Sequence, residues 1–464
     1  MSHRIHSTAT LPCTSSGKGW NSPLDVHRTW LMSSFLGSTL PCNALRSAAV
    51  RSPRIPQELA DSIIDELATS YEHTALAACS LTCRAWLHRC RSHIHKTLRL
   101  DHNSRIDRLT ELYSGYLADY IQCLSIDACD TGGTEMPIPH PWLDAARPLL
   151  KMLKRINRLS LDGITWNDFE PETKQLFLTQ FPLVTDIWAA TCDFWDSREF
   201  VRLLQAFPNL KVLRMETSDW ELAECDDVLK ENPPTLHLDH LDAGELCSGP
   251  ADIARWASSN RTEVSIKNIH FAWQGCESTQ SLGQLLRAAG SSLKHLSVLV
   301  EDHGRPPSHS NDDHLTLRHN SELNTISLFP RLEVPESADI SWVSDILSDV
   351  SSPRLEMVAV YIKVPSYNHL THSNCRWDTI DKALSNRNLE SLKRVDVCVL
   401  RPIGSGGDSL DPNVPGFLRT LMPTLESLFE SYDYGHGFIR AQREDMQPGF
   451  REFDIGPIHF RGSR

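Results

Sequence analysis

Residues 207–215 read Phe-Pro-Asn-Leu-Lys-Val-Leu-Arg-Met, a short turn followed by closely spaced apolar side chains. Three later stretches repeat the phrase: Ser-Ser-Leu-Lys-His-Leu-Ser-Val at 291–298, Ser-Pro-Arg-Leu-Glu-Met-Val-Ala-Val at 352–360, and Leu-Glu-Ser-Leu-Lys-Arg-Val-Asp-Val at 389–397. Alternation of apolar and polar residues after a turn is typical of a strand with one buried face. The phrase therefore predicts a repeated strand, and this repeat decides the fold of most of the chain.

Stretches with helical spacing lie between the strand candidates. Residues 142–154, for example, lead into Arg158-Leu-Ser-Leu-Asp162. Corresponding strand positions recur about every 25 to 40 residues, a period typical of solenoids. A unit of one strand and one helix cannot close its own core and has to stack on its neighbours. Further strand candidates are 97–101, 123–127, 184–188, 236–238, 264–266 and 323–328.

This rhythm resembles degenerate leucine-rich repeats with long units. The resemblance implies an α/β fold, an irregular solenoid whose curved parallel sheet carries helices on its outer face. The asparagine ladder of regular leucine-rich repeats is mostly missing, and the repeat length drifts. A doubly wound α/β domain also alternates strands and helices, so it stays open as the structural alternative.

A different pattern precedes the repeats, in the stretch Arg54-Ile-Pro-Gln-Glu-Leu-Ala-Asp-Ser-Ile-Ile-Asp-Glu-Leu-Ala68. Pro56 suits a first helical turn, where the missing N–H has no intrahelical partner to lose. Glu58 places negative charge near the positive end of the helix dipole. The helical spacing predicts one apolar stripe, made of Leu59, Ile63, Ile64 and Leu67.

Two more helical segments follow within residues 76–94. The apolar positions are Leu76, Cys79 and Cys83 in the second segment and Trp86, Leu87, Cys90 and Ile94 in the third. Three short amphipathic helices cannot bury much surface by themselves. We therefore expect either the rest of the chain or a partner protein to cover them.

The helical stretch resembles the F-box, the module that docks a substrate receptor onto a Skp-type adaptor in cullin–RING ubiquitin ligases. The opening Ile55-Pro-x-Glu-Leu59 and the ending Cys79-Ser-Leu-Thr-Cys-Arg-x-Trp86 carry the resemblance, with Ile63 and Leu67 between them. Ile55 and Thr82 depart from the usual leucine and valine. Degenerate leucine-rich arrays commonly follow an F-box in fungal and other eukaryotic receptors. The resemblance implies that Ile55, Pro56, Leu59, Ile63, Leu67, Leu81 and Trp86 carry adaptor binding, while some of them hold the helices together.

Composition limits the classes of function. The chain of 464 residues has a formal net charge of −13, which argues against a phosphate backbone as its main partner. No apolar run approaches the roughly 18 residues of a membrane span. The 13 cysteines are scattered without a Cys-x-x-Cys pair, which favours reduced thiols in the cytoplasm or nucleus.

The sequence matches catalytic and metal-binding motifs only incompletely. Gly404-Ser-Gly-Gly lacks the Lys-Ser/Thr that a phosphate-binding loop needs. The Ser-x-x-Lys spacing at 291–294 lies in a repeat turn without companion motifs. Cysteines and histidines crowd between Cys79 and His95, but Cys79 and Cys83 belong to the apolar stripe, so buried packing is the expected role. We therefore expect no enzyme activity, no cofactor and no metal site.

These observations predict four segments. They are a disordered leader at 1–53, an F-box-like helical module at 54–96, an irregular leucine-rich-repeat array at 97–433, and a C-terminal tail or cap at 434–464. The predicted function is a substrate-recognition adaptor of a Skp–cullin–F-box-type ligase, whose repeats bind an unidentified substrate protein. A leucine-rich-repeat scaffold unconnected to ubiquitin ligation is the alternative.

Overall fold

A computed structural model of the chain describes residues 55–70, 72–128, 141–221, 235–244, 253–255, 263–273, 276–300, 315–330, 340–363, 376–385, 389–400, 422, 431–435 and 438–442. The predictions for the leader, for the Gly404-Ser-Gly-Gly stretch and for most of the tail concern residues outside this set. Contacts group the described residues into two units, one ending at Lys96 and the other beginning at Thr97.

The first unit is a three-helix module of α2 (Gln57–Thr69), α3 (His73–Thr82) and α4 (Arg84–Ile94). Pro56 is the N-cap of α2 rather than part of its first turn, and its carbonyl accepts hydrogen bonds from the Leu59 and Ala60 amides. Glu58 lies in the first turn, as the sequence predicts. Cys83 separates α3 from α4 because its backbone is extended, with φ −157° and ψ 163°. The small core of the module centres on Ile64, Leu76 and Cys90, which are fully buried.

The second unit is built on one long sheet. The described residues form a 13-stranded sheet, in which the last two strands, β15 and β14, pair antiparallel and the other eleven are parallel. The parallel strands are β1 (Thr97–Asp101), β2 (Cys123–Asp127), β3 (Arg158–Asp162), β4 (Asp186–Ala190), β6 (Val212–Glu216), β8 (Leu236–Ala243), β9 (Val264–Trp273), β10 (His295–Val300), β11 (Thr325–Phe329), β12 (Met357–Lys363) and β13 (Arg394–Leu400). The hairpin strands are β14 (Ser431–Gly435) and β15 (Phe438–Gln442).

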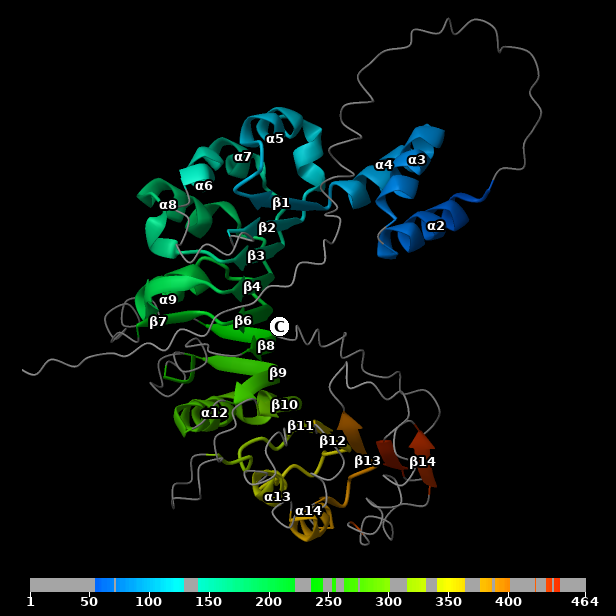
Figure 1. Cartoon of the computed structure of the whole chain (residues 1–464), viewed down its shortest axis with the longest axis vertical. Coiled ribbons are helices and arrows are strands. Elements are labelled where there is room, and N and C mark those ends of the chain that lie inside the picture. The colour runs from blue at the N-terminus through cyan, green and yellow to red at the C-terminus, as the bar shows by residue number, and fades with distance from the viewer. Residues whose placement is uncertain are drawn as a thin grey trace, which may run out of the picture. The chain divides into compact units, whose positions relative to one another are not determined.

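The helices of this unit lie along one side of the ladder of strands (Figure 1). They are α5 (Ile106–Leu112), α6 (Pro141–Ala145), α7 (Arg147–Met152), α8 (Pro171–Gln180), α9 (Ser197–Gln205), α12 (Cys276–Ala289), α13 (Ser341–Ser348) and α14 (Trp377–Leu384), with short 3-10 turns η1 (Tyr116–Tyr120), η2 (Trp166–Asp168) and η3 (Gly290–Ser292). The parallel strands follow one another in chain order. The predicted α/β solenoid with an open, curved parallel sheet is confirmed, whereas a doubly wound domain would reverse its strand order at a switch point.

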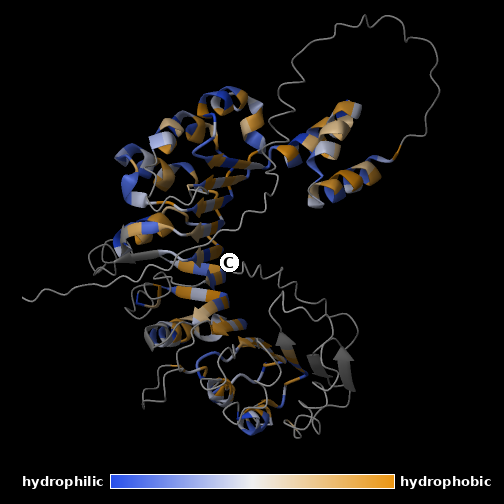
Figure 2. Cartoon of the chain, viewed as in Figure 1, coloured by the Kyte–Doolittle hydropathy of each residue, from blue (hydrophilic) through white to orange (hydrophobic). Residues whose placement is uncertain are grey.

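The register explains why this sequence forms this sheet. Each repeat contributes to the sheet five residues in register with the neighbouring strands, which we call a rung. In each rung the second and fourth side chains face the helices, so leucine, isoleucine and valine recur there and are buried. The second-position residues are Leu98, Leu124, Leu159, Ile187, Leu213, Leu241, Ile269, Leu296, Ile326, Val358 and Val395. Figure 2 shows hydrophobic residues recurring within the strands of the sheet. A single continuous core therefore runs through the stacked repeats.

Several predicted strands begin two residues too early. The strand candidate at 323–328 starts with Leu323, yet β11 begins at Thr325. Leu323 is fully buried, but its N–H donates to the Asn320 carbonyl at 3.2 Å and closes a turn. The same offset occurs at Leu293, before β10. An apolar residue that closes a turn into the core therefore has the sequence pattern of a strand.

Other polar side chains replace the missing asparagine ladder. Asn320 donates from Nδ2 to the carbonyls of Leu286 and Gly290, at 2.8 and 2.9 Å. The Ser352 hydroxyl lies 2.8 Å from the Leu323 carbonyl, and the Ser391 hydroxyl lies 2.9 Å from the Leu355 carbonyl. Each side chain reaches the backbone of the preceding repeat and satisfies a group that the strands leave unpaired.

An aromatic cluster fills the core around α8. The ring centroid of Phe177 lies 5.9 Å from those of Trp166 and Phe181 and 6.1 Å from that of Phe169, which stacks on it. Beside this cluster, β5 (Asp193–Asp196) and β7 (Asp219–Glu221) form a second, two-stranded parallel sheet. The sequence did not predict this second sheet or the β14–β15 hairpin, since neither has the repeated phrase.

Candidate functional site

The helical module exposes more large apolar side chains than its size would lead one to expect. The relative exposure of Ile55 is 51%, of Leu59 53%, of Ile63 43% and of Leu81 72%. Ile55 lies two residues before α2, and Leu59 and Ile63 follow at four-residue spacing, which places Leu59 and Ile63 along one side of this helix. Scattered single exposures are ordinary, but a concentration in so small a module marks a surface suited to a partner.

A neighbouring side of α2 faces inward. Ala60 and Ile64 are buried, and Leu67 packs partly buried against the core of the module. Trp86 of α4 packs against the same core. The single apolar stripe predicted for α2 is therefore divided between an inner side and an exposed side, because α3 and α4 cover only part of it. Figure 2 shows the hydrophobic residues along these helices.

The seven residues predicted to carry partner binding fall into two groups. Five are exposed: Ile55, Pro56, Leu59, Ile63 and Leu81. We name these five the outer apolar face. The other two, Leu67 and Trp86, pack inside the module. The sequence pattern could not separate the groups, because both have helical spacing.

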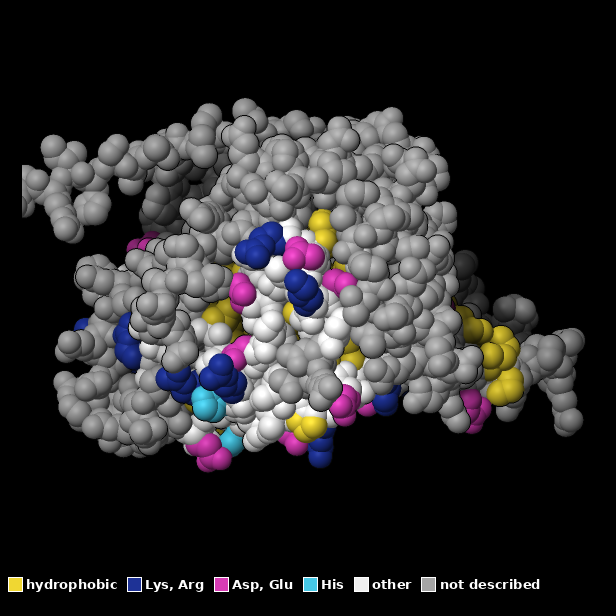
Figure 3. Space-filling model, turned by 90° about the horizontal axis from the view of Figure 1, so that it is seen from below, with side chains coloured by type: hydrophobic (Ala, Val, Ile, Leu, Met, Phe, Trp, Pro, Cys, Tyr) yellow, Lys and Arg dark blue, Asp and Glu magenta, His cyan; other side chains and the backbone are white. Residues whose placement is uncertain are grey.

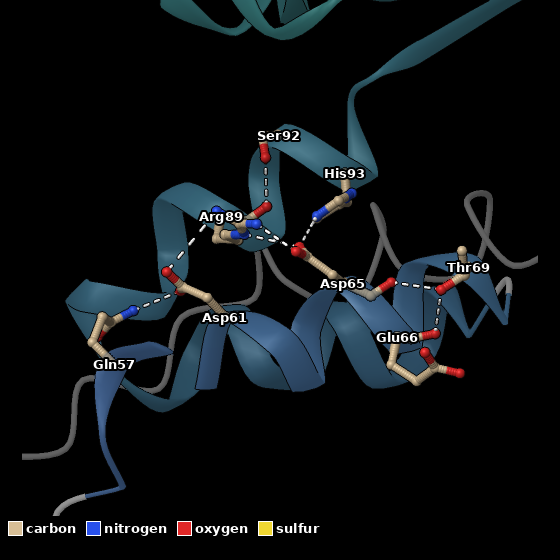
Figure 4. A network of polar contacts seen from close by, with 8 residues as sticks. All are labelled: Gln57, Asp61, Asp65, Glu66, Thr69, Arg89, Ser92 and His93. Carbon is tan, nitrogen blue, oxygen red and sulfur yellow. Dashed lines mark hydrogen bonds and ion pairs between the residues drawn. The ribbon is translucent and has the colours of Figure 1, made fainter. Parts of the chain in front are cut away.

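An ionic network joins the first and last helices of the module. Arg89 and His93 of α4 point toward Asp65 of α2 (Figure 4). The Arg89 Nε donates to Asp65 Oδ1 at 2.8 Å, a second guanidinium nitrogen bonds Oδ2, and His93 Nε2 lies 2.8 Å from Oδ1. Arg89 also lies 3.9 Å from the Asp61 carboxylate, to which Gln57 donates at 2.7 Å. This network fixes the rotation of α2 and thereby the direction of its outer side.

The network changes the acidity of its central carboxyl. The pKa of Asp65 is lowered from 3.8 to about 2. The hydrogen bonds from Arg89 are the largest cause, and His93 adds to their effect, while burial of the carboxyl opposes it to a smaller extent. The same contact raises the pKa of Arg89. Because the folded pKa of Asp65 lies below its unfolded value, this stabilisation is present above about pH 4 and is lost as the pH falls toward 2.

We expect Asp65→Asn to destabilise the helical module. A pKa shift of this size corresponds to about 2.5 kcal/mol if fully expressed. Since 43% of the side chain is exposed, solvent screening reduces the expected loss to about 1 kcal/mol. Hydrogen exchange of the α2 and α4 amides in the full chain measures it, and the variant should lose the acid sensitivity below pH 4. Glu66→Gln removes the same charge from α2 without touching the network, so an equal effect of both variants would contradict this role.

One expectation about this module was wrong, and its basic residues are spread along α4. Arg84 begins α4, where the helix dipole disfavours it. Arg91 and His93 do lie in the last turn, whereas Arg89 pairs with α2. Cys83 was expected to be buried, but it is exposed because the chain leaves the helical path there. Cys79 does pack against the core.

The described residues offer no clear metal site or ligand cavity. No group of three His, Cys, Asp or Glu side chains there is placed to hold a metal ion. A hollow lined by Leu282, Leu296 and Ile346 encloses no space large enough for a water molecule. On the face displayed in Figure 3, the described basic, acidic and histidine side chains are intermixed. None of the described helices is both long and apolar enough to cross a bilayer.

A comparison with solved structures gives a slight likeness. No protein-family model matches the chain, and no curated protein matches it. Among solved structures, the crystal structure of the Rad7 and Elc1 complex in yeast aligns with 13% identity and a TM-score of 0.30, over 74% of this chain and 80% of that chain. The case for a function therefore comes from the geometry of the chain itself.

Proposed function

We propose that this protein is a substrate receptor that docks a Skp-type adaptor through its helical module and a substrate protein through its repeat array. The proposal extends the F-box resemblance of residues 55–86. An associated cullin–RING ligase would transfer ubiquitin, so the chain itself would perform no chemistry and act by raising the effective concentration of the substrate. The compartment that fits this role is the cytoplasm or the nucleus.

The outer apolar face carries the proposal. Leu59 and Leu81 are more than half exposed, and completing their burial would contribute a share of the roughly 1.5 to 3 kcal/mol that burying a whole leucine side chain is worth. A partner that covers the outer apolar face would supply this burial. The module keeps its own core of Ile64, Leu76 and Cys90 behind that face, so binding would not require it to unfold.

The repeat array supports the second half of the proposal. In an open sheet covered by helices on one side, the first, third and fifth side chains of each rung lie on the other side. These positions hold varied polar and aromatic residues, such as Arg99, Trp188 and His270, rather than the leucines of the core positions. Such a surface is suited to recognising a protein by shape and charge.

Co-purification of the full chain with a purified Skp-type adaptor tests the proposal. We expect a stable one-to-one complex by size-exclusion chromatography and a dissociation constant in the micromolar range or tighter by calorimetry. A chain that stays monomeric with excess adaptor would reject the proposal and favour the leucine-rich-repeat scaffold.

A further inference from the structure

The registers of the parallel strands place one residue of each repeat in a common row, just before the first rung position. The Lys211 amide donates to the Thr185 carbonyl at 2.8 Å, the Asp239 amide to Lys211 at 2.7 Å, and the Lys294 amide to Lys267 at 2.8 Å. We name this series the leading row. From β2 to β13 it consists of Gln122, Asn157, Thr185, Lys211, Asp239, Lys267, Lys294, Asn324, Glu356 and Lys393.

Charge is unevenly distributed along the leading row. The β2, β3, β4 and β11 positions are neutral, and the last two, Glu356 and Lys393, neutralise each other at 2.8 Å. The four consecutive positions from β6 to β10 hold three lysines and one aspartate. A local excess of positive charge on a chain with a net charge of −13 points to a partner of opposite sign.

The lysines of this segment are exposed. Lys267 pairs with Asp239 at 2.7 Å, which leaves the flanking Lys211 and Lys294 without a carboxylate partner among the described residues. The next row adds His240 and His295, from β8 and β10. The segment therefore offers ammonium groups on both sides of an internally neutralised pair.

Neighbouring positive charges contribute to two pKa shifts in this segment. Hydrogen bonding from Lys267 is the largest cause that lowers the pKa of Asp239, and the charges of Lys211 and His240 add to it. Burial, followed by the charges of His240 and Lys294, lowers the pKa of His295. These causes favour the neutral form of His295, and the lysines carry the positive charge of this surface.

We propose that Lys211 and Lys294, which flank the Lys267–Asp239 pair, form a docking site for an Asp/Glu-rich segment of a partner protein. Naming that partner as the substrate rests on the proposed function, whereas the binding itself does not. Neighbouring strands lie about 4.8 Å apart, so the site spans about 14 Å, the length of four or five residues of extended peptide. Several carboxylates of one short segment can then reach the lysines together.

A short acidic peptide fits better than a nucleic acid. Phosphate-backbone binding needs an extended basic face, but Asp239 and Asp242 interrupt this one, and the chain as a whole is acidic. Carboxylate side chains can alternate with other residues and so avoid the two aspartates. The site would therefore select acidic partners by charge and spacing.

Fluorescence anisotropy with the full chain and a labelled Glu-rich peptide tests this proposal. We expect saturable binding that weakens with salt, and no binding of the same peptide with Gln in place of Glu. Lys211→Glu combined with Lys294→Glu should weaken binding about tenfold or more, because it reverses two contacts and keeps the Lys267–Asp239 pair. Lys211→Gln with Lys294→Gln should weaken it less and serves as the second variant if charge reversal disturbs folding.

Lys151→Glu with Lys154→Glu is the matched control, since both lysines are exposed and the net charge changes equally. Unchanged peptide binding by this control is expected. An equal loss in the control, equal binding of the Gln peptide, or tighter binding of a single-stranded DNA oligonucleotide would overturn the docking site. Adaptor binding by the same variants, measured in parallel, distinguishes this failure from failure of the proposed function, because the substitutions lie outside the helical module.

Discussion

Leu59→Asp combined with Leu81→Asp is expected to abolish adaptor binding by the full chain. Both side chains are more than half exposed, so the substitutions remove no contact of the folded module core. In a complex they would bury two carboxylates in an apolar interface. Truncation of an interface anchor typically costs about 2 kcal/mol or more, and an unpaired buried charge adds to that cost. Calorimetric titration should show a decrease in affinity of at least about 100-fold, with each 1.4 kcal/mol counting as tenfold.

Two further variants separate this effect from loss of structure. Leu183→Asp makes the same change at a side chain of the repeat array that is 51% exposed, and it should leave adaptor affinity unchanged. Leu67→Ala acts on a residue packed in the module and should lower its stability without a comparable direct effect on affinity. Full adaptor affinity in the Leu59/Leu81 double variant would show that the outer apolar face is not the docking surface.

Phe177→Ala is expected to have the largest effect on stability. The Phe177 ring is fully buried and lies against Trp166, Phe169 and Phe181. Removing a buried phenylalanine ring costs about 3 to 5 kcal/mol, including the cavity that remains. Because repeats contact mainly their neighbours, the loss should be concentrated around α8. Urea denaturation and hydrogen exchange of the β3 and β4 amides measure it.

Tyr116→Ala is the control for this prediction, because it removes an aromatic ring that is 58% exposed. It should change the free energy of unfolding by less than about 1 kcal/mol. Similar losses in the two variants would mean that the aromatic cluster is not a stabilising centre of the array.

The fold was largely predictable because the alternation of apolar and polar residues recurs in the sequence with each strand. The rungs at 97–101, 123–127 and 158–162 have the predicted bounds, since alternation there begins with the strand itself. Several later strands, β11 among them, begin two residues after the predicted start, because a leucine such as Leu323 is buried in a turn. The second sheet was not predictable, as β5 and β7 pair across repeats through stretches of only four and three residues.

The candidate site was predictable as a set of residues but not as a surface. Helical spacing identifies Leu59 and Ile64 equally well as apolar positions of α2, and only the placement of α3 and α4 determines which of them is covered. The Asp65–Arg89 contact joins residues 24 apart in sequence and has no local pattern. The leading row was missed for a related reason, since its lysines are neighbours only after the strands have aligned.

The β14–β15 hairpin has a consequence for how this protein can change in length. Repeat proteins grow by duplication of a strand and helix, and each copy needs a parallel strand to stack on. Here β15 lies antiparallel against β13, and β14 follows it at the sheet edge. A duplicated unit inserted before β13 meets parallel neighbours on both sides, whereas one appended after the hairpin does not. Natural or engineered variants of different length should therefore differ in the number of internal repeats and keep the hairpin as their common end.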